Sequence, residues 1–152
     1  MTTIITNRKA RRDYTILDTM ETGIELKGTE VKSLRNKKGN LSDSFAKIEN
    51  GQVFIFNLHI SPYEFGNRNN HDPLRTRRLL LHKSEIRKLF GQTSIKGHSL
   101  IPLKLYFKKG KVKVELSIAE GKTKFDKRET IRKKEDLLKM QRAKKRAYQG
   151  KN

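Results

Sequence analysis

Histidine and carboxylate residues could supply acid–base catalysis or metal binding, but here they are scattered along the sequence. The four histidines, His59, His71, His82 and His98, lack a spacing typical of metal sites, and the chain has no cysteine. His71 precedes Asp72, yet neighbours in sequence do not form a base with its orienting carboxylate. No phosphate-binding glycine loop or GxSxG motif occurs. We expect no enzyme, no metal site and no cofactor; a ribonuclease that uses His and Lys is the open alternative.

Basic residues dominate the composition. The chain has 36 Lys and Arg against 16 Asp and Glu, a formal net charge of +20 on 152 residues. Such an excess repels itself unless a polyanion lies nearby. Nucleic acid is the first candidate and an anionic membrane surface is the second. The N-terminus lacks the apolar core of a signal peptide, and no run approaches a membrane span, so we expect a cytoplasmic protein.

The stretch from Val53 to His82 is the most informative part of the chain. Phe54, Phe56, Leu58 and Ile60 share one strand face at period two, while the opposite face turns from apolar to polar. A proline-containing polar loop follows, and then Arg75-Thr76-Arg77-Arg78 directly precedes three leucines. A solvated loop is one interpretation. A rim that faces a polyanion is the other.

The rest of the chain up to residue 120 predicts short strands and two short helices. Residues 13–26 form two strands or one bent strand, and 28–35 form a helix with Thr29 as N-cap. Asn50-Gly51 predicts a hairpin turn. Residues 82–90 form a second helix with Ile86, Leu89 and Phe90 on one side and Gly91 at its end. A last hairpin turns at 108–110, and in its second strand Val112, Val114, Leu116 and Ile118 alternate with polar residues, which predicts a half-buried strand with one wet face. Because βαβ alternation is absent, we expect a small antiparallel barrel.

Both ends of the chain are basic. Residues 1–12 are predicted to be an N-terminal arm, and residues 8–12 carry four positive charges. Residues 13–120 are the expected barrel. Residues 121–152 hold 13 Lys and Arg against 4 Asp and Glu, and they favour helix but lack an apolar stripe. We expect this tail to be disordered in isolation and helical on a polyanion; a tail with no specific partner is the alternative.

Several blocks in this order resemble the SmpB family, the SsrA-binding proteins of bacteria. They are Asn7-Arg8-Lys9-Ala10-Arg11, Gly28 to Arg35, His59-Ile60-Ser61-Pro62-Tyr63, His71-Asp72-Pro73, Arg77 to Leu81 and Asp126-Lys127-Arg128. The resemblance covers nearly the whole chain. It implies a mainly β fold with short α-helices, a closed antiparallel Greek-key barrel related to the OB-fold, and a basic C-terminal tail.

The resemblance also implies a function in trans-translation. The protein would bind the tRNA-like domain of transfer-messenger RNA (tmRNA, SsrA RNA) and bring it to ribosomes stalled on messages without a stop codon. The tail would become helical in the empty mRNA path near the decoding centre and contact small-subunit RNA. Alanyl-tRNA synthetase and elongation factor Tu would be indirect partners of a monomer. A structural ribosomal protein or general RNA chaperone would share its charge and barrel without preferring tmRNA.

The family's RNA-facing positions match several residues here. Asn7, Arg11, Tyr14, Glu21 and Leu80 match directly, although Tyr14 and Leu80 could instead be core. The full expected tmRNA-binding set is Asn7, Arg8, Lys9, Arg11, Arg12, Tyr14, Glu21, Lys32, Arg35, Phe45, Arg77, Arg78 and Leu80. The expected ribosome-binding set in the tail is Gly121, Lys122, Lys124, Phe125, Asp126, Lys127 and Arg128.

Three residues depart from the family pattern. Arg12 stands where the family more often has His, and Phe45 where it often has Tyr; each keeps a cation or a ring. Phe125 replaces a His that precedes Asp-Lys-Arg in some members, so it can stack but cannot donate a hydrogen bond.

Overall fold

The computed structural model describes residues 1–66, 70–122 and 124–149; beyond residue 123 it describes the side chains of Arg128 and residues 131–143 only. The chain divides into two compact units, Met1–Gly121 and Lys122–Asn152. The elements of the first unit are β1 (Thr2–Thr6), α1 (Arg8–Asp13), β2 (Tyr14–Ile24), α2 (Gly28–Arg35), β3 (Gly39–Asn40), β4 (Phe45–Glu49), β5 (Gln52–Phe56), β6 (His59–Ile60), β7 (Arg77–Leu80), α3 (Lys83–Thr93), β8 (His98–Lys108) and β9 (Lys111–Gly121). The second unit contains α4 (Lys124–Gln149).

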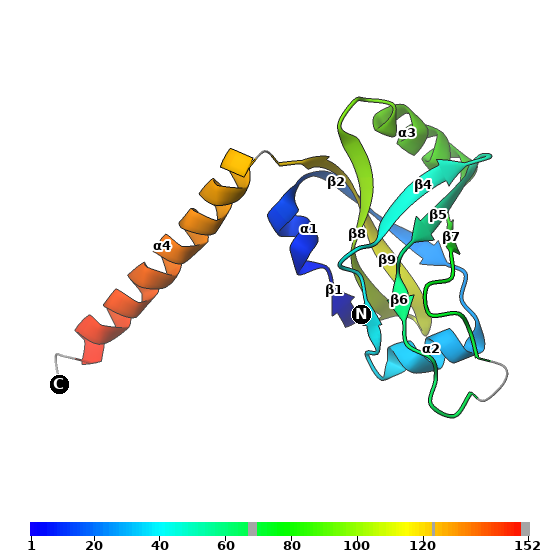
Figure 1. Cartoon of the computed structure of the whole chain (residues 1–152), viewed down its shortest axis with the longest axis horizontal. Helices are drawn as coiled ribbons and strands as arrows, with labels where there is room; N and C mark the ends of the chain where they lie inside the picture. Colours follow the sequence, from blue (N-terminus) through cyan, green and yellow to red (C-terminus); the bar gives the residue numbers. More distant parts are fainter. Residues whose placement is uncertain (67–69, 123, 150–152) are drawn as a thin grey trace. The chain divides into compact units, whose positions relative to one another are not determined.

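The first unit is mainly β, as expected, and its strands form a ring (Figure 1). The sheet runs in the order β1-β8-β4-β5-β7-β2-β9, and β9 pairs back with β8. All these pairings are antiparallel. Because β8 pairs with β1, β4 and β9, it is the strand on which the ring closes.

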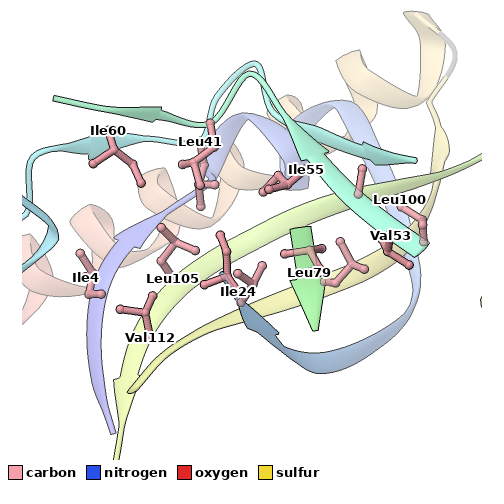
Figure 2. Packing of buried hydrophobic residues seen from close by; sticks show 14 of the residues in the cluster. Ile4, Ile24, Leu41, Val53, Ile55, Ile60, Leu79, Leu100, Leu105 and Val112 are labelled. Atoms are coloured by element: carbon pink, nitrogen blue, oxygen red, sulfur yellow. The ribbon is translucent and has the colours of Figure 1, made fainter. Parts of the chain in front are cut away.

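Aliphatic side chains from every side of the ring fill its interior, as Figure 2 shows for ten labelled residues. Val53, Ile55, Leu105, Val114 and Leu116 are fully buried in this main cluster. Val112, Val114, Leu116 and Ile118 of β9 lie in the main cluster, so the predicted alternation along this strand is confirmed. Ser117 and Ala119, on the other face of β9, are also buried. Ala119 belongs to a second cluster with Ala10 of α1, so this end of β9 is not wet.

Residues 1–12 are not a free arm. Thr2–Thr6 pairs with β8, and Ile4 is buried in the main cluster. Ala10 of α1 packs against Ile101 and Leu103 of β8. The charge of residues 8–12 suggested an arm, but the buried Ile4 and Ala10 anchor this segment to the ring.

The predicted strand from Val53 to Ile60 is two short strands whose inward faces are out of phase. Val53 and Ile55 of β5 are fully buried, whereas Phe54 and Phe56 are only partly buried. Asn57 has a positive φ of 60°, which interrupts the alternation, and Leu58 and Ile60 then point inward. The prediction that Phe54, Phe56, Leu58 and Ile60 share one strand face is therefore wrong.

Both predicted hairpin turns are confirmed. Asn50 and Gly51 have φ values of 51° and 73°, and Lys109 and Gly110 have 52° and 75°. Two successive positive φ angles are what a two-residue turn of this kind requires. Residues 13–26, predicted as two strands or one bent strand, contain a single long strand, β2, with a register shift between Ile16 and Asp18 in its pairing with β9.

The helices differ from prediction at their ends. α2 spans Gly28–Arg35 as predicted, but its N-cap is Lys27, and the Thr29 hydroxyl lies 2.9 Å from Nδ1 of buried His71. α3 continues through Gly91 to Thr93. Leu89 is buried, but Phe90 is 63% exposed, so the apolar residues predicted to share one side of this helix have different environments.

A buried ion cluster joins α2 to β7 and to the preceding loop. Glu30 and Arg77 are both fully buried, and Arg77 Nε donates to Glu30 Oε2. Arg77 also donates to the carbonyl oxygen of Leu58 at 2.6 Å. Arg75 Nη2 lies 2.6 Å from Glu30 Oε1. Desolvation alone would raise the pKa of Glu30, but hydrogen bonds from Arg75, the Lys27 amide and Arg77 outweigh it and lower that pKa.

The second unit is the long helix α4. Its described large apolar side chains are at least 43% exposed; they are Ile131, Leu137, Leu138 and Met140. This agrees with the predicted lack of an apolar stripe. That the tail is disordered in isolation stays a prediction.

Arg77→Met should lower the free energy of unfolding by about 3–5 kcal/mol, because it leaves the Glu30 carboxylate buried without its fully buried partner. Arg78→Met is the matched control. The Arg78–Glu25 pair is 43% and 57% exposed, so its loss should cost under about 1 kcal/mol. Urea unfolding of both variants measures the difference. Equal losses would contradict a structural role for the buried pair.

Candidate nucleic-acid interface

An open groove of about 680 Å³ lies between α1, β4, β8 and the end of α3. Tyr14, Phe45 and Lys9 from the expected RNA-binding set line it. Phe45 stacks on Phe56 with ring centroids 5.3 Å apart, and Lys47 Nζ lies 5.4 Å from the Phe45 ring. Aromatic rings beside lysines can stack unpaired bases and neutralise phosphates. We name this surface the α1 groove.

Asn7 also lines the α1 groove, but its side chain is only 2% exposed and has a structural role. Its Nδ2 donates to the carbonyl oxygens of Leu41 at 3.1 Å and Pro102 at 2.9 Å. Its Oδ1 accepts from the amide of Ala10 and caps α1. These bonds use both hydrogens of the amide nitrogen and one lone pair of its oxygen, so Asn7 holds α1 against β8 in this structure.

The basic residues of the N-terminal segment lie on α1. Arg8, Lys9, Arg11 and Arg12 are exposed. Lys9 Nζ lies 3.2 Å from Asp43, and Arg12 Nε lies 3.2 Å from Asp13. Exposed ion pairs of this kind are weak, so both cations can exchange a carboxylate for a phosphate.

A second, smaller groove of about 370 Å³ lies where β2 meets β7 and the β8–β9 turn. Leu80 lines it and is 47% exposed, which supports a contact role rather than a core role. A Cβ on Gly23 would lie 3.1 Å from Leu80 Cβ, so glycine allows Leu80 to sit close to β2. Lys111 and Lys113 add positive charge to the same surface. We name it the Leu80 groove.

Glu21 lies on β2 two residues before Gly23, and two residues of β8 hold its carboxylate. Lys108 Nζ lies 3.2 Å from Glu21 Oε2. A hydrogen bond from Tyr106 and then the bond from Lys108 lower the pKa of Glu21. Desolvation and the bond to Glu21 raise the pKa of Tyr106 to about 12. Glu21 is therefore an oriented carboxylate that can accept hydrogen bonds from an amino group or a 2′-hydroxyl.

The structure separates the expected tmRNA-binding residues rather than gathering them in one place. Tyr14 and Gly23 lie at opposite ends of β2, at most about 30 Å apart at the usual strand rise. Tyr14 pairs with Gly121, so the α1 groove adjoins the end of β9. The Leu80 groove lies at the far end of the same strands.

The remaining basic residues of the expected set have different environments. Arg77 is fully buried, so it supports the fold and does not present its guanidinium to a ligand. Arg78 and Arg35 are exposed. Lys32 is exposed and lies 5.4 Å from the Tyr63 ring.

The expected ribosome-binding residues begin at the end of β9. Gly121 is the last residue of β9, Lys122 is partly exposed, and Arg128 of α4 is exposed. The side chains of Lys124, Phe125, Asp126 and Lys127 lie outside the described residues.

Sequence reasoning missed Tyr106, Lys104, Lys108 and Lys113 on the outer faces of β8 and β9. Lys104 Nζ lies 5.5 Å from the Tyr106 ring and 3.5 Å from Glu115. For Lys113 the strict alternation of β9 was the available signal, because it placed Lys113 and Glu115 on one outer face.

The described residues include no group of three or more His, Cys, Asp or Glu that could hold a metal ion. His71 is enclosed by Thr29 and the carbonyl oxygen of Ile60, at 2.9 and 2.8 Å. His98 Nδ1 lies 3.2 Å from the carbonyl oxygen of Gln92. Among the described helices, none is long and apolar enough to cross a membrane.

Tyr106→Phe should raise the pKa of Glu21 toward its ordinary value of 4.5, because the variant loses the hydrogen bond that contributes most to lowering it. The lowered pKa of Glu21 stabilises the fold above pH 4.5, and this contribution is lost as the pH falls through the folded-state pKa. Carboxyl-detected NMR titration measures the shift. Tyr63→Phe is the control, and an unchanged Glu21 titration in Tyr106→Phe would contradict the contact.

Comparison with known proteins identifies the family. The family model "SmpB protein" matches residues 4–146. The SsrA-binding protein of Geobacillus thermodenitrificans is 59% identical over 140 residues, covering 92% of this chain and 90% of that protein. The SsrA-binding protein of Bacillus subtilis is 58% identical over 137 residues, covering 90% and 88%.

A solved structure described as "tmRNA-SmpB: a journey to the center of the bacterial ribosome" superimposes with a TM-score of 0.68. The matching chain is 51% identical to this one, and the match covers 84% of this chain and 94% of that chain. The sequence blocks, the ring of strands and these similarities agree: the chain belongs to the SmpB protein family.

Proposed function

We propose that this protein binds tmRNA through its tRNA-like domain and acts with it on stalled ribosomes in trans-translation. The observation that carries the proposal is 57–60% identity to SsrA-binding proteins over at least 90% of the chain. A match to an SmpB structure described with tmRNA and the ribosome supports it. The role needs no chemistry from the protein, which acts by binding, in the cytoplasm, as a monomer.

The Leu80 groove and Glu21 are suited to a folded RNA. Leu80 offers an apolar side chain for a ribose or base, Lys111 and Lys113 offer cations, and Glu21 offers a fixed acceptor. The α1 groove adds Tyr14 and Phe45 as rings. The RNA-facing set then comprises the exposed or half-buried residues of the expected set and excludes Asn7 and Arg77.

The division of the chain supports two roles. The unit Met1–Gly121 is a ring of strands that we assign to the closed Greek-key barrels related to the OB-fold, and it binds tmRNA. The tail from Gly121 enters the empty mRNA path and orders as helix on small-subunit RNA; the four exposed apolar residues of α4 leave it little to gain from folding alone. Alanyl-tRNA synthetase and elongation factor Tu charge and deliver the RNA.

A labelled tRNA-like domain should stay bound to the protein when bulk tRNA is added in excess at near-physiological salt. The reason is that the grooves recognise the folded shape of the RNA and not its charge alone. Its affinity should still fall with salt, with a log–log slope of several units, because each neutralised phosphate releases a counterion. Competition anisotropy at several salt concentrations measures both. Equal competition by bulk tRNA would contradict the proposal and favour a general RNA-binding protein.

A chain that ends at Glu120 should bind the tRNA-like domain nearly as tightly as the full chain but should fail to support peptide tagging. Residues 1–120 carry a net charge of +11, and both grooves lie within them. Anisotropy and a reconstituted tagging assay measure the two activities. If the truncated, folded chain loses RNA affinity as well, the division into two roles is wrong.

A further inference from the structure

A third groove, of about 620 Å³, lies between α3 and the β4–β5 turn, and no residue of the expected RNA-binding set lines it. Lys83, Ile86, Arg87 and Phe90 line it from α3 at positions i, i+3, i+4 and i+7, which share one helix face. Ile48, Asn50, Gly51 and Gln52 line it from the hairpin. In Figure 1 the end of β4 lies beside α3. We name this surface the α3 groove.

Phe90 is the unusual residue of the α3 groove. It is 63% exposed, while its neighbour Leu89 is fully buried. Ile48 and Ile86 are partly buried and pack against the main core, so they form a fixed apolar floor beside the exposed ring. A flat apolar ligand can lie there without displacing any core side chain.

The charged side chains that line the α3 groove are cations. Lys83 and Arg87 are exposed, and none of the described lining residues is acidic. Asn50 and Gln52 add amide donors and acceptors. A ligand that fits these lining residues has a flat apolar part with polar edges and a separate negatively charged part. An unpaired nucleotide has these properties.

The α3 groove also continues a surface already assigned to RNA. Phe90 lines the α1 groove as well, together with Tyr14, Phe45 and Lys47. An RNA strand that leaves the α1 groove past Phe90 therefore meets Arg87 and Lys83 next.

We infer that the α3 groove binds an unpaired RNA segment, with a base stacked on Phe90 and phosphates held by Lys83 and Arg87. The inference rests on the proposed function only in taking RNA as the ligand. It adds a contact on α3 that is independent of Glu21, Leu80 and the tail.

The test measures anisotropy of a labelled octauridylate with the full-length protein. Phe90→Ala should weaken binding by roughly fivefold or more, because base–aromatic stacking is lost. Phe90→Trp keeps a ring and should retain wild-type affinity. Arg87→Gln and Lys83→Gln should each reduce the log–log salt slope by about 0.7, as expected for one phosphate contact on a single strand.

Lys88→Gln is the matched control, because Lys88 is an exposed cation on the same helix that does not line the groove. Photocrosslinking with an octamer of 4-thiouridine is a second measurement. Binding of the octamer to the basic tail would not produce the same crosslinks. The crosslinks of the octamer, mapped by mass spectrometry, should include the peptide that contains Phe90. Phe90 is mostly exposed, so the melting temperatures of its variants should match that of the wild type.

The inference is overturned if Phe90→Ala and Arg87→Gln behave like Lys88→Gln and no crosslink falls on α3. It is also overturned if oligoglutamate displaces the octamer and shows the same dependence on these variants, because the groove would then belong to an acidic protein partner. If the wild type does not prefer the tRNA-like domain, the proposed function fails instead. If the wild type keeps that preference and the α3 variants bind the tRNA-like domain and the octauridylate with wild-type affinity, only the inference about the α3 groove is wrong.

Discussion

The buried pair between Glu30 and Arg77 is the interaction on which the arrangement around β7 depends. Two charges removed from water are stable only when their geometry and additional hydrogen bonds are good. Here α2 supplies the carboxylate, β7 supplies the guanidinium, and Leu58, just before β6, supplies a further acceptor. Three segments distant in sequence are therefore fixed relative to one another. One of them carries Leu80, whose exposed side chain is thus presented from a rigid strand.

A closed ring of strands then determines where charge can gather. Its interior is filled by aliphatic side chains, and among the described Lys and Arg residues all except Arg77 are exposed or half-buried on the outer faces, the helices and the turns. Aromatic rings are partly exposed in the α1 groove, and Phe90 joins this groove to the α3 groove. The Leu80 groove lies at the other end of β2. The RNA-facing surface is consequently a path around the ring rather than a single pocket.

Local signals in the sequence predicted the local structure well. Asn50-Gly51 and residues 108–110 predicted their turns because a two-residue turn requires particular φ angles. The bounds of α2 and the inward face of β9 were also predicted. Features that depend on partners distant in the sequence were not predicted. Arg77 is buried because Glu30 lies across the fold, and Asn7 is buried because Leu41 and Pro102 offer carbonyl groups.

The candidate site shows the same limit. Leu80 and Glu21 were singled out through a family resemblance, and the structure places both on exposed positions near one groove. Tyr106 and Lys108, which hold Glu21, could not be found because their connection to β2 exists only after β8 and β9 pair. The exposure of Phe90 was not predicted, because helical periodicity does not say where the core ends along the helix.

The pairing of β1 with β8 has a consequence for biosynthesis. Thr2 lies opposite Phe107, so the first strand to leave the ribosome has no hydrogen-bonding partner until most of the chain has been translated. The amino-terminal segment therefore emerges early but joins the sheet late, and ring closure awaits the β8–β9 hairpin. A nascent chain interrupted before residue 98 lacks every residue of β8 and β9, so it cannot close the ring and leaves part of its apolar interior open to water.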